Sequence, residues 1–413
     1  MNEHSGLRPP TRVVVFVVVF VVAITVGGTL LSGGVSLGDD SPPPTPLPAG
    51  TLLEDADTSD LPGWARQWSD TDFSRRTVNL EEIISGGVPP DGIPPIDHPQ
   101  YVEPETGDAW FEPQEPVIQV EVDGDVRAYP LQIMTWHEIV NTEIGGESIG
   151  VTFCPLCNSA VAFDRGSIDE LGEVRLGVSG LLRNSDLVMW DDKTESLWQQ
   201  ITGEAIVGEM AGERLTMIPA TIVSWAAFKE AHPDGLVLSV NTGFDRNYGS
   251  NPYAGYDNVD QSPFLFQGQT DDRQSPMIRV LGIDHNDDPR AYPFPDLEEH
   301  PVVHDEIGGD PVVIFWQPGA TSALDQMDIA ASRDVGMAAA FNPVVNGQEL
   351  TFVSEGEEFR DEQTGSTWNI AGEATDGELE GERLEEYVSG AHFWFAWAAF
   401  QPDTEIWSPD EES

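Results

Sequence analysis

The sequence contains little cysteine and little positive charge. Only two of its 413 residues are cysteine, and Lys193 and Lys229 are its only lysines. Acidic residues number 72 and basic residues 19, so the net charge at pH 7 is −53. No basic run of any length exists, which argues against nucleic acid and anionic lipid as partners. Two cysteines are also too few for a four-cysteine zinc ribbon.

Several common catalytic motifs are missing as well. The sequence has no GxSxG, P-loop or HExxH motif and no dinucleotide fingerprint after a strand, so it gives no evidence of hydrolase or nucleotide chemistry. Composition excludes a disordered chain, because twelve Trp, eighteen Phe and 39% hydrophobic residues are too many for a chain that buries nothing. The acidity therefore indicates a folded protein adapted to concentrated salt, which screens the self-repulsion of its charges.

Residues 1–35 are predicted to be a membrane anchor or a signal segment. Val13 to Leu31 form a run of 19 mostly apolar positions, which as a helix would reach about 28 Å, close to the thickness of the hydrocarbon layer. Arg8 and Arg12 precede the run, so the N-terminus is expected inside the cell. The length of the run favours a retained anchor, with the membrane as a partner. The alternative is a cleaved signal and a secreted protein. In both cases the body is expected outside the cytoplasm.

The second half of the sequence repeats motifs of the first half in the same order. The pairs are Arg127-Ala128-Tyr129-Pro130 with Arg290-Ala291-Tyr292-Pro293, Ile144-Gly145-Gly146 with Ile307-Gly308-Gly309, Gly212-Glu213-Arg214-Leu215 with Gly381-Glu382-Arg383-Leu384, and Ser224-Trp225-Ala226-Ala227-Phe228 with Ala396-Trp397-Ala398-Ala399-Phe400. Two tandem copies of one unit are the simplest explanation. Gln317 and Ala320 stand where the first copy has Cys154 and Cys157, so cysteine chemistry belongs to the first copy only.

Strand signals dominate both copies, and the predicted fold is mainly β with minor α (α+β). Val117–Val122 and Val126–Tyr129 lie on either side of Asp123-Gly124, a favoured two-residue hairpin turn. Helix is predicted only for short stretches such as Leu131–Trp136 and Ile222–Ala231. The chain is expected to consist of an N-terminal anchor or signal over 1–35, a Pro-rich acidic linker and lead-in over 36–97, a first repeat unit with the cysteines over 98–240, a connection over 241–275, and a second repeat unit over 276–413.

Both cysteines lie in Cys154-Pro155-Leu156-Cys157, where two thiols three positions apart suit a soft metal or a reversible disulfide. A second hairpin is predicted from His137–Ile144 to Glu147–Phe153, with Gly145-Gly146 as its turn. The register of a two-residue turn places His137 directly opposite Cys154, on the same face. The sequence therefore predicts a cluster of His137, Cys154 and Cys157.

Three interpretations of this cluster stay open. A metal centre with Cys154, Cys157 and His137 as ligands would hold Cu(I) or Zn(II). A redox dithiol would exchange electrons with an unknown partner. In the third case the protein is a non-enzymatic surface or ligand-binding module, and the cysteines form a structural disulfide whose very short loop stabilises little. Glu138 is predicted to be a surface carboxylate, on the face opposite His137. The other side chains predicted to line the site are Asn141, Asp164, Arg165, Asn184 and Asp186.

One ordered set of motifs carries a resemblance to a known family. The set consists of Arg127-Ala128-Tyr129-Pro130, Trp136-His137-Glu138-Ile139-Val140-Asn141, Ile144-Gly145-Gly146, Cys154-Pro155-Leu156-Cys157, Phe163-Asp164-Arg165, Gly180-Leu181-Leu182 and Asn184-Ser185-Asp186. It resembles the DUF3179 family, an uncharacterised family of bacteria and archaea, from about Gly87 onward. The excess of acid resembles that of haloarchaeal proteins. The resemblance implies no established activity, cofactor or catalytic residue.

Overall fold

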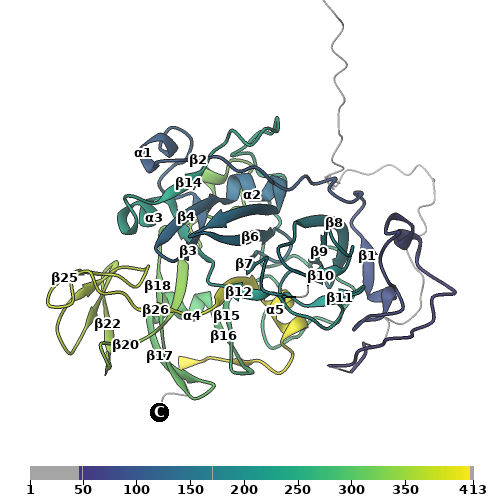
Figure 1. Cartoon of the computed structure of the whole chain (residues 1–413). Helices are drawn as coiled ribbons and strands as arrows, with labels where there is room; N and C mark the ends of the chain where they lie inside the picture. Colours follow the sequence, from purple (N-terminus) through teal and green to yellow (C-terminus); the bar gives the residue numbers. More distant parts are fainter. Residues whose placement is uncertain (1–45, 49, 170, 410–413) are drawn as a thin grey trace, which may run out of the picture. The chain divides into compact units, whose positions relative to one another are not determined.

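The structure is a computed structural model that describes residues 46–48, 50–169 and 171–409. The predicted membrane anchor or signal over 1–35 lies outside these residues. Within the described ranges, no helix is both long enough and apolar enough to cross a membrane. By their contacts, the described residues belong to one unit. The fold is mainly β, as predicted, with several small sheets and short helices (Figure 1).

The first half begins with the predicted hairpin. Strands β3 (Pro116–Val122) and β4 (Asp125–Pro130) pair in the expected register, with Val122 opposite Asp125. Asp123 and Gly124 both have positive φ, which is what a two-residue type I′ turn requires. The chain continues directly into the α2 helix (Leu131–His137), one residue longer than predicted.

Three sheets make up the first half (Figure 1). The first has the order β13-β3-β4-β14-β2, with β13 at Thr221–Ser224, β14 at Leu236–Leu238 and β2 at Tyr101–Val102. The second has the order β12-β7-β6-β5, with β12 at Thr216–Ile218, β7 at Ser159–Asp164, β6 at Glu147–Cys154 and β5 at Ile139–Ile144. The third has the order β1-β8-β9-β10-β11, with β1 at Ile83–Ser85, β8 at Leu176–Arg183, β9 at Asp186–Asp191, β10 at Leu197–Gln199 and β11 at Ala205–Val207. Short helices α1 (Pro104–Gly107) and α3 (Trp225–Ala231) complete it.

The second half has three sheets with closely similar strand orders. The first is β27-β15-β16-β28, with β27 at Ser389–Phe393, β15 at Arg279–His285, β16 at Asp288–Pro293 and β28 at Glu405–Ile406. The second is β17-β18-β19-β26, with β17 at Val302–Ile307, β18 at Asp310–Gln317, β19 at Met337–Asn342 and β26 at Glu385–Glu386. The third is β22-β23-β24-β25, with β22 at Phe352–Glu355, β23 at Glu358–Asp361, β24 at Thr367–Trp368 and β25 at Ala374–Asp376. Helices α4 (Phe294–Glu299) and α5 (Trp394–Phe400) follow β16 and β27, and a short pair, β20 (Val344–Val345) with β21 (Gln348–Glu349), completes this half. Such a common order is what a duplicated unit would produce; the duplication itself stays a prediction.

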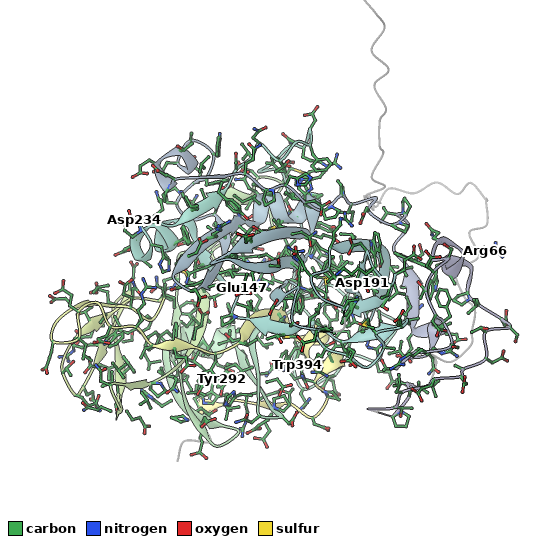
Figure 2. All side chains as sticks on the ribbon, viewed as in Figure 1. Arg66, Glu147, Asp191, Asp234, Tyr292 and Trp394 are labelled. Atoms are coloured by element: carbon green, nitrogen blue, oxygen red, sulfur yellow. The ribbon has the colours of Figure 1, made fainter. Side chains whose placement is uncertain are left out.

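The same buried hydrogen-bond network occurs in both halves. At the end of β9, Asp191 accepts hydrogen bonds from the Trp198 indole and from Thr194 (Figure 2). At the end of β23, Asp361 accepts the same bonds from Trp368 and Thr364. The two indole bonds are both 3.0 Å long. Each carboxylate therefore connects a turn to the neighbouring strand. The side chains of Asp191, Trp198, Asp361 and Trp368 have no exposure to solvent.

The predicted lead-in over 36–97 contributes more than a linker would. Its strand β1 pairs with β8 at the edge of the third sheet (Figure 1). Three of its aromatic side chains, Trp64, Trp68 and Phe73, are buried in a cluster with residues of β9 to β11. A large apolar side chain contributes about 1.5–3 kcal/mol when it is fully buried, so these three together stabilise the attached segment by several kcal/mol. The lead-in is thus part of the folded body from about Trp64 onward.

Glu115, directly before β3, is a carboxyl group buried in this fold. It is 5% exposed and accepts a 2.7 Å hydrogen bond from Gln132 of α2. Burial raises the pKa of Glu115 from 4.5 to about 7. Because the folded state holds this proton more tightly than the unfolded state, the contribution of Glu115 to stability falls as pH rises from 4.5 to 7.

We therefore expect Glu115→Gln to stabilise the protein at pH 8 and to change little at pH 4. The expected gain at pH 8 is up to about 3 kcal/mol, since each tenfold change in proton affinity corresponds to about 1.4 kcal/mol. Urea unfolding at both pH values, in constant molar salt, measures it. Glu112→Gln, at a neighbouring exposed position, is the control. A gain of equal size at both pH values would contradict the explanation by burial.

Candidate metal centre

The two cysteines flank a tight turn between β6 and β7. Cys154 is the last residue of β6 and lies opposite Ser159, the first residue of β7. The Cys157 amide donates to the Cys154 carbonyl, and Asn158 adopts a positive φ of 52°, so the chain reverses within four residues. Both thiols are free, and both cysteines are buried, at 2% and 0% exposure.

Asp186 is the third member of this group. The chain turns sharply between β8 and β9, where Asn184 and Ser185 both have positive φ, and Asp186 is the first residue after this turn. One carboxylate oxygen of Asp186 and the sulfurs of Cys154 and Cys157 all lie within 4.8 Å of one another.

The two oxygens of Asp186 differ in their surroundings. Oδ2 accepts hydrogen bonds from the Gln199 side chain at 2.6 Å and from the Ile201 amide at 3.1 Å. Oδ1 is buried and accepts no N–H or O–H hydrogen bond from the described residues; the donors beside the carboxylate are the S–H groups of Cys154 and Cys157. The position of Asp186 is thus fixed by Oδ2, while the carboxylate also faces two thiols whose protons a metal ion can displace.

A second buried carboxyl group lies close by. Glu138 is 7% exposed and shares a hydrogen bond with Tyr253, and its charge acts on both Cys154 and Asp186. Burial raises the pKa of Glu138 to about 8 and that of Asp186 to about 6. Burial also raises the pKa of both thiols. Four acidic groups thus share a buried site, and among the described residues no ion pair involves Asp186 or Glu138.

Segments from later in the chain close the site. In the connection, the Tyr256 hydroxyl donates to the Leu156 carbonyl at 3.0 Å. The Ser185 hydroxyl donates to the Phe264 carbonyl at 2.5 Å. From β27 of the second half, the Phe393 amide donates to the Cys157 carbonyl at 2.9 Å. The connection and the second half therefore cover the cysteine turn.

His137, the predicted third ligand, lies elsewhere. Its Nδ1 bonds the Pro94 carbonyl at 2.7 Å and its Nε2 bonds the Tyr248 hydroxyl at 2.6 Å. Because a carbonyl only accepts, Nδ1 carries the proton and Nε2 accepts from Tyr248. His137 does not belong to the group within 4.8 Å that Cys154 and Cys157 form.

The helix end explains this difference. The register of β5 and β6 is the predicted one, with Ile144 opposite Glu147 and Ile139 opposite Thr152. The strand begins only at Ile139, however, because α2 continues through His137 and Glu138 then takes a positive φ of 59°. The alternation of faces is therefore broken before Ile139, and the prediction that Glu138 is a surface carboxylate is wrong.

Of the five other predicted site residues, only Asp186 belongs to the group. Asn141 connects β5 to β8 through two hydrogen bonds with Leu176. Arg165 donates to three backbone carbonyls and Asp164 stabilises the turn after β7. Asn184 forms the turn before Asp186. All four have structural contacts, and their role as residues that line the site stays a prediction.

The site defines the protein as a mainly-β protein with a buried dithiol–carboxylate group. A group of this kind offers donors for a thiophilic metal and, without a metal, two adjacent thiols. The chain belongs to the DUF3179 family, described as a protein of unknown function, which matches residues 90–404. No curated protein and no solved structure matches the chain.

Proposed function

We propose that the chain binds a thiophilic transition metal, zinc in the first place, through Cys154, Cys157 and Asp186. The observation that supports this most directly is the group itself, in which a buried carboxylate and two free, buried thiols have their donor atoms within 4.8 Å of one another. A bound cation would satisfy the carboxylate and both sulfurs at once.

The spacing of the donors fits one ion. Two sulfurs about 2.3 Å from a tetrahedral zinc ion are about 3.8 Å apart, and a carboxylate oxygen at ~2.1 Å lies slightly closer to each sulfur. All three donor atoms lie within 4.8 Å of one another, which is compatible with these distances. Three protein donors leave a fourth position for water or another ligand, which is the pattern of catalytic zinc sites.

The charges of the site support a cation as well. Without one, burial disfavours the ionised form of both thiols, of Asp186 and of Glu138. A divalent ion reverses this, because it stabilises thiolate and carboxylate and displaces their protons. A carboxylate in place of His137 favours Zn(II) over Cu(I), which prefers soft ligands only.

The second candidate function, a redox dithiol, is supported by the two free thiols alone. Thiol exchange needs an accessible thiolate. Both sulfurs are buried, and burial raises the pKa of each thiol. The two thiols are therefore inaccessible and poorly nucleophilic, which disfavours a redox function.

Metal analysis of the full-length chain, purified without oxygen and in molar salt, tests the proposal. We expect about one zinc ion per wild-type chain, and a loss of at least tenfold in metal content in Cys154→Ser and Asp186→Asn. His137→Gln and Asp164→Asn should keep their metal, since both side chains have other partners.

Each result has a distinct meaning. Negligible metal in the wild type, together with a disulfide that forms under mild oxidant, would support the redox dithiol and overturn the metal site. Loss of metal in His137→Gln with retention in Asp186→Asn would show that the wrong third ligand has been assigned. One copper ion per chain in place of zinc would support the three proposed ligands and show that the metal is copper.

A further inference from the structure

A cavity of about 220 Å³ lies between the two halves, apart from the cysteine turn. One wall comes from β7 and β12 and includes Val161, Met217 and Ile218. The opposite wall comes from β15, β27 and the α5 helix, which begins at Trp394 (Figure 2). The walls are mostly apolar, so the few polar side chains that line the cavity indicate which polar group a ligand would carry.

His392 is one exception. It is 4% exposed, stacks on Trp397 at 5.4 Å with 15° between the rings, and makes no hydrogen bond to the described chain. Burial lowers the pKa of His392 to about 3, so the ring is neutral. Its Nδ1 is fully enclosed without a partner. An enclosed ring nitrogen is less costly as an acceptor than as an unpaired N–H, which places the proton on Nε2.

Gly390 leaves the Nε2 edge of the ring open. A Cβ atom at position 390 would lie 2.7 Å from His392 Nε2, so any side chain there would cover it. An imidazole edge without a protein partner thus borders an apolar cavity.

We propose that this cavity binds a small neutral organic molecule, a single ring that carries one oxygen atom. The ring would pack against Val161, Met217 and Trp397, and the oxygen would accept a hydrogen bond from His392 Nε2–H. The size agrees, because an apolar cavity of about 150 Å³ holds benzene and this one has room for a substituent. Asp284 and Arg214, which also line the cavity, carry opposite charges, so the site selects neither anions nor cations.

Phenol is the probe, measured by calorimetry and ligand-observed NMR on the full-length chain in molar salt. A dissociation constant on the order of 1 mM is expected for a ligand of this size. His392→Phe keeps the stacking on Trp397 and removes the Nε2–H donor, so it should raise the dissociation constant for phenol about tenfold. Toluene, which has no oxygen, should bind both proteins equally.

Two further variants keep the test decisive. Val388→Trp changes a side chain that is 38% exposed at the cavity wall, so it should block phenol without affecting the fold. His232→Phe is the matched control, since His232 is also a buried histidine with an unpartnered nitrogen but does not line the cavity. Absence of saturable phenol binding to the wild type, or equal binding to wild type and His392→Phe, would overturn the proposal. The metal analysis above does not depend on this result.

Discussion

If zinc occupies the proposed site, its removal by a chelator is expected to lower the melting temperature of the wild-type chain by about 5 °C or more. A ligand that binds only the folded state at a thousand times its Kd stabilises it by about 4 kcal/mol. For a unit the size of residues 41–413, an unfolding entropy of ~2.1 cal/mol/K per residue converts this to about 5 °C. The effect is expected to be reversible on return of zinc.

Matched variants distinguish this effect from general screening. Divalent cations at high concentration screen a chain of charge −53 and raise its stability without a specific site. Mg²⁺ at the same concentration is therefore the ionic control, because it prefers oxygen ligands and keeps its waters. For each of the variants Asp186→Asn and Cys154→Ser, the melting temperature should be the same with and without chelator. A wild-type protein that responds equally to Zn²⁺ and Mg²⁺ would contradict a specific site.

Local signals in the sequence predict the strands around this site well. Asp123-Gly124 and Gly145-Gly146 specify two-residue turns, and both hairpins have the register that these turns require. The thiols of Cys154 and Cys157 lie together because the turn that joins them is local. Predictions that depend on a turn or on spacing of a few residues are thus confirmed by the structure.

The third member of the cysteine group could not be predicted in this way. His137 was assigned on the assumption that strand alternation reaches back to it, whereas α2 ends there and Glu138 takes a left-handed conformation. Asp186 is 32 positions from Cys154 and comes near through the turn between β8 and β9. The polar run Arg183-Asn184-Ser185-Asp186 signalled this turn, but which of its side chains faces the sulfurs depends on packing between two sheets.

The largest effects on stability are expected from Asp191→Ala and Asp361→Ala. Each carboxylate is buried and accepts from an indole and from a threonine of the following turn. Truncation leaves the Trp198 or Trp368 indole N–H unpaired in the core, together with a threonine amide. Two such groups, at about 1–3 kcal/mol each, together with the lost contacts should cost roughly 3–5 kcal/mol in each variant.

Urea unfolding in constant molar salt measures both variants, with Glu362→Ala as the control because that neighbour of Asp361 is exposed. The two losses should agree within about 1 kcal/mol, since the bonds to each carboxylate have nearly the same lengths. Neither Asp191 nor Asp361 belongs to the group of Cys154, Cys157 and Asp186, so zinc should change the loss at neither position. If Asp361→Ala lowered the free energy of unfolding no more than Glu362→Ala does, the network of the second half would not stabilise the fold as its geometry indicates. In that case the resemblance between the two halves would be one of strand order alone.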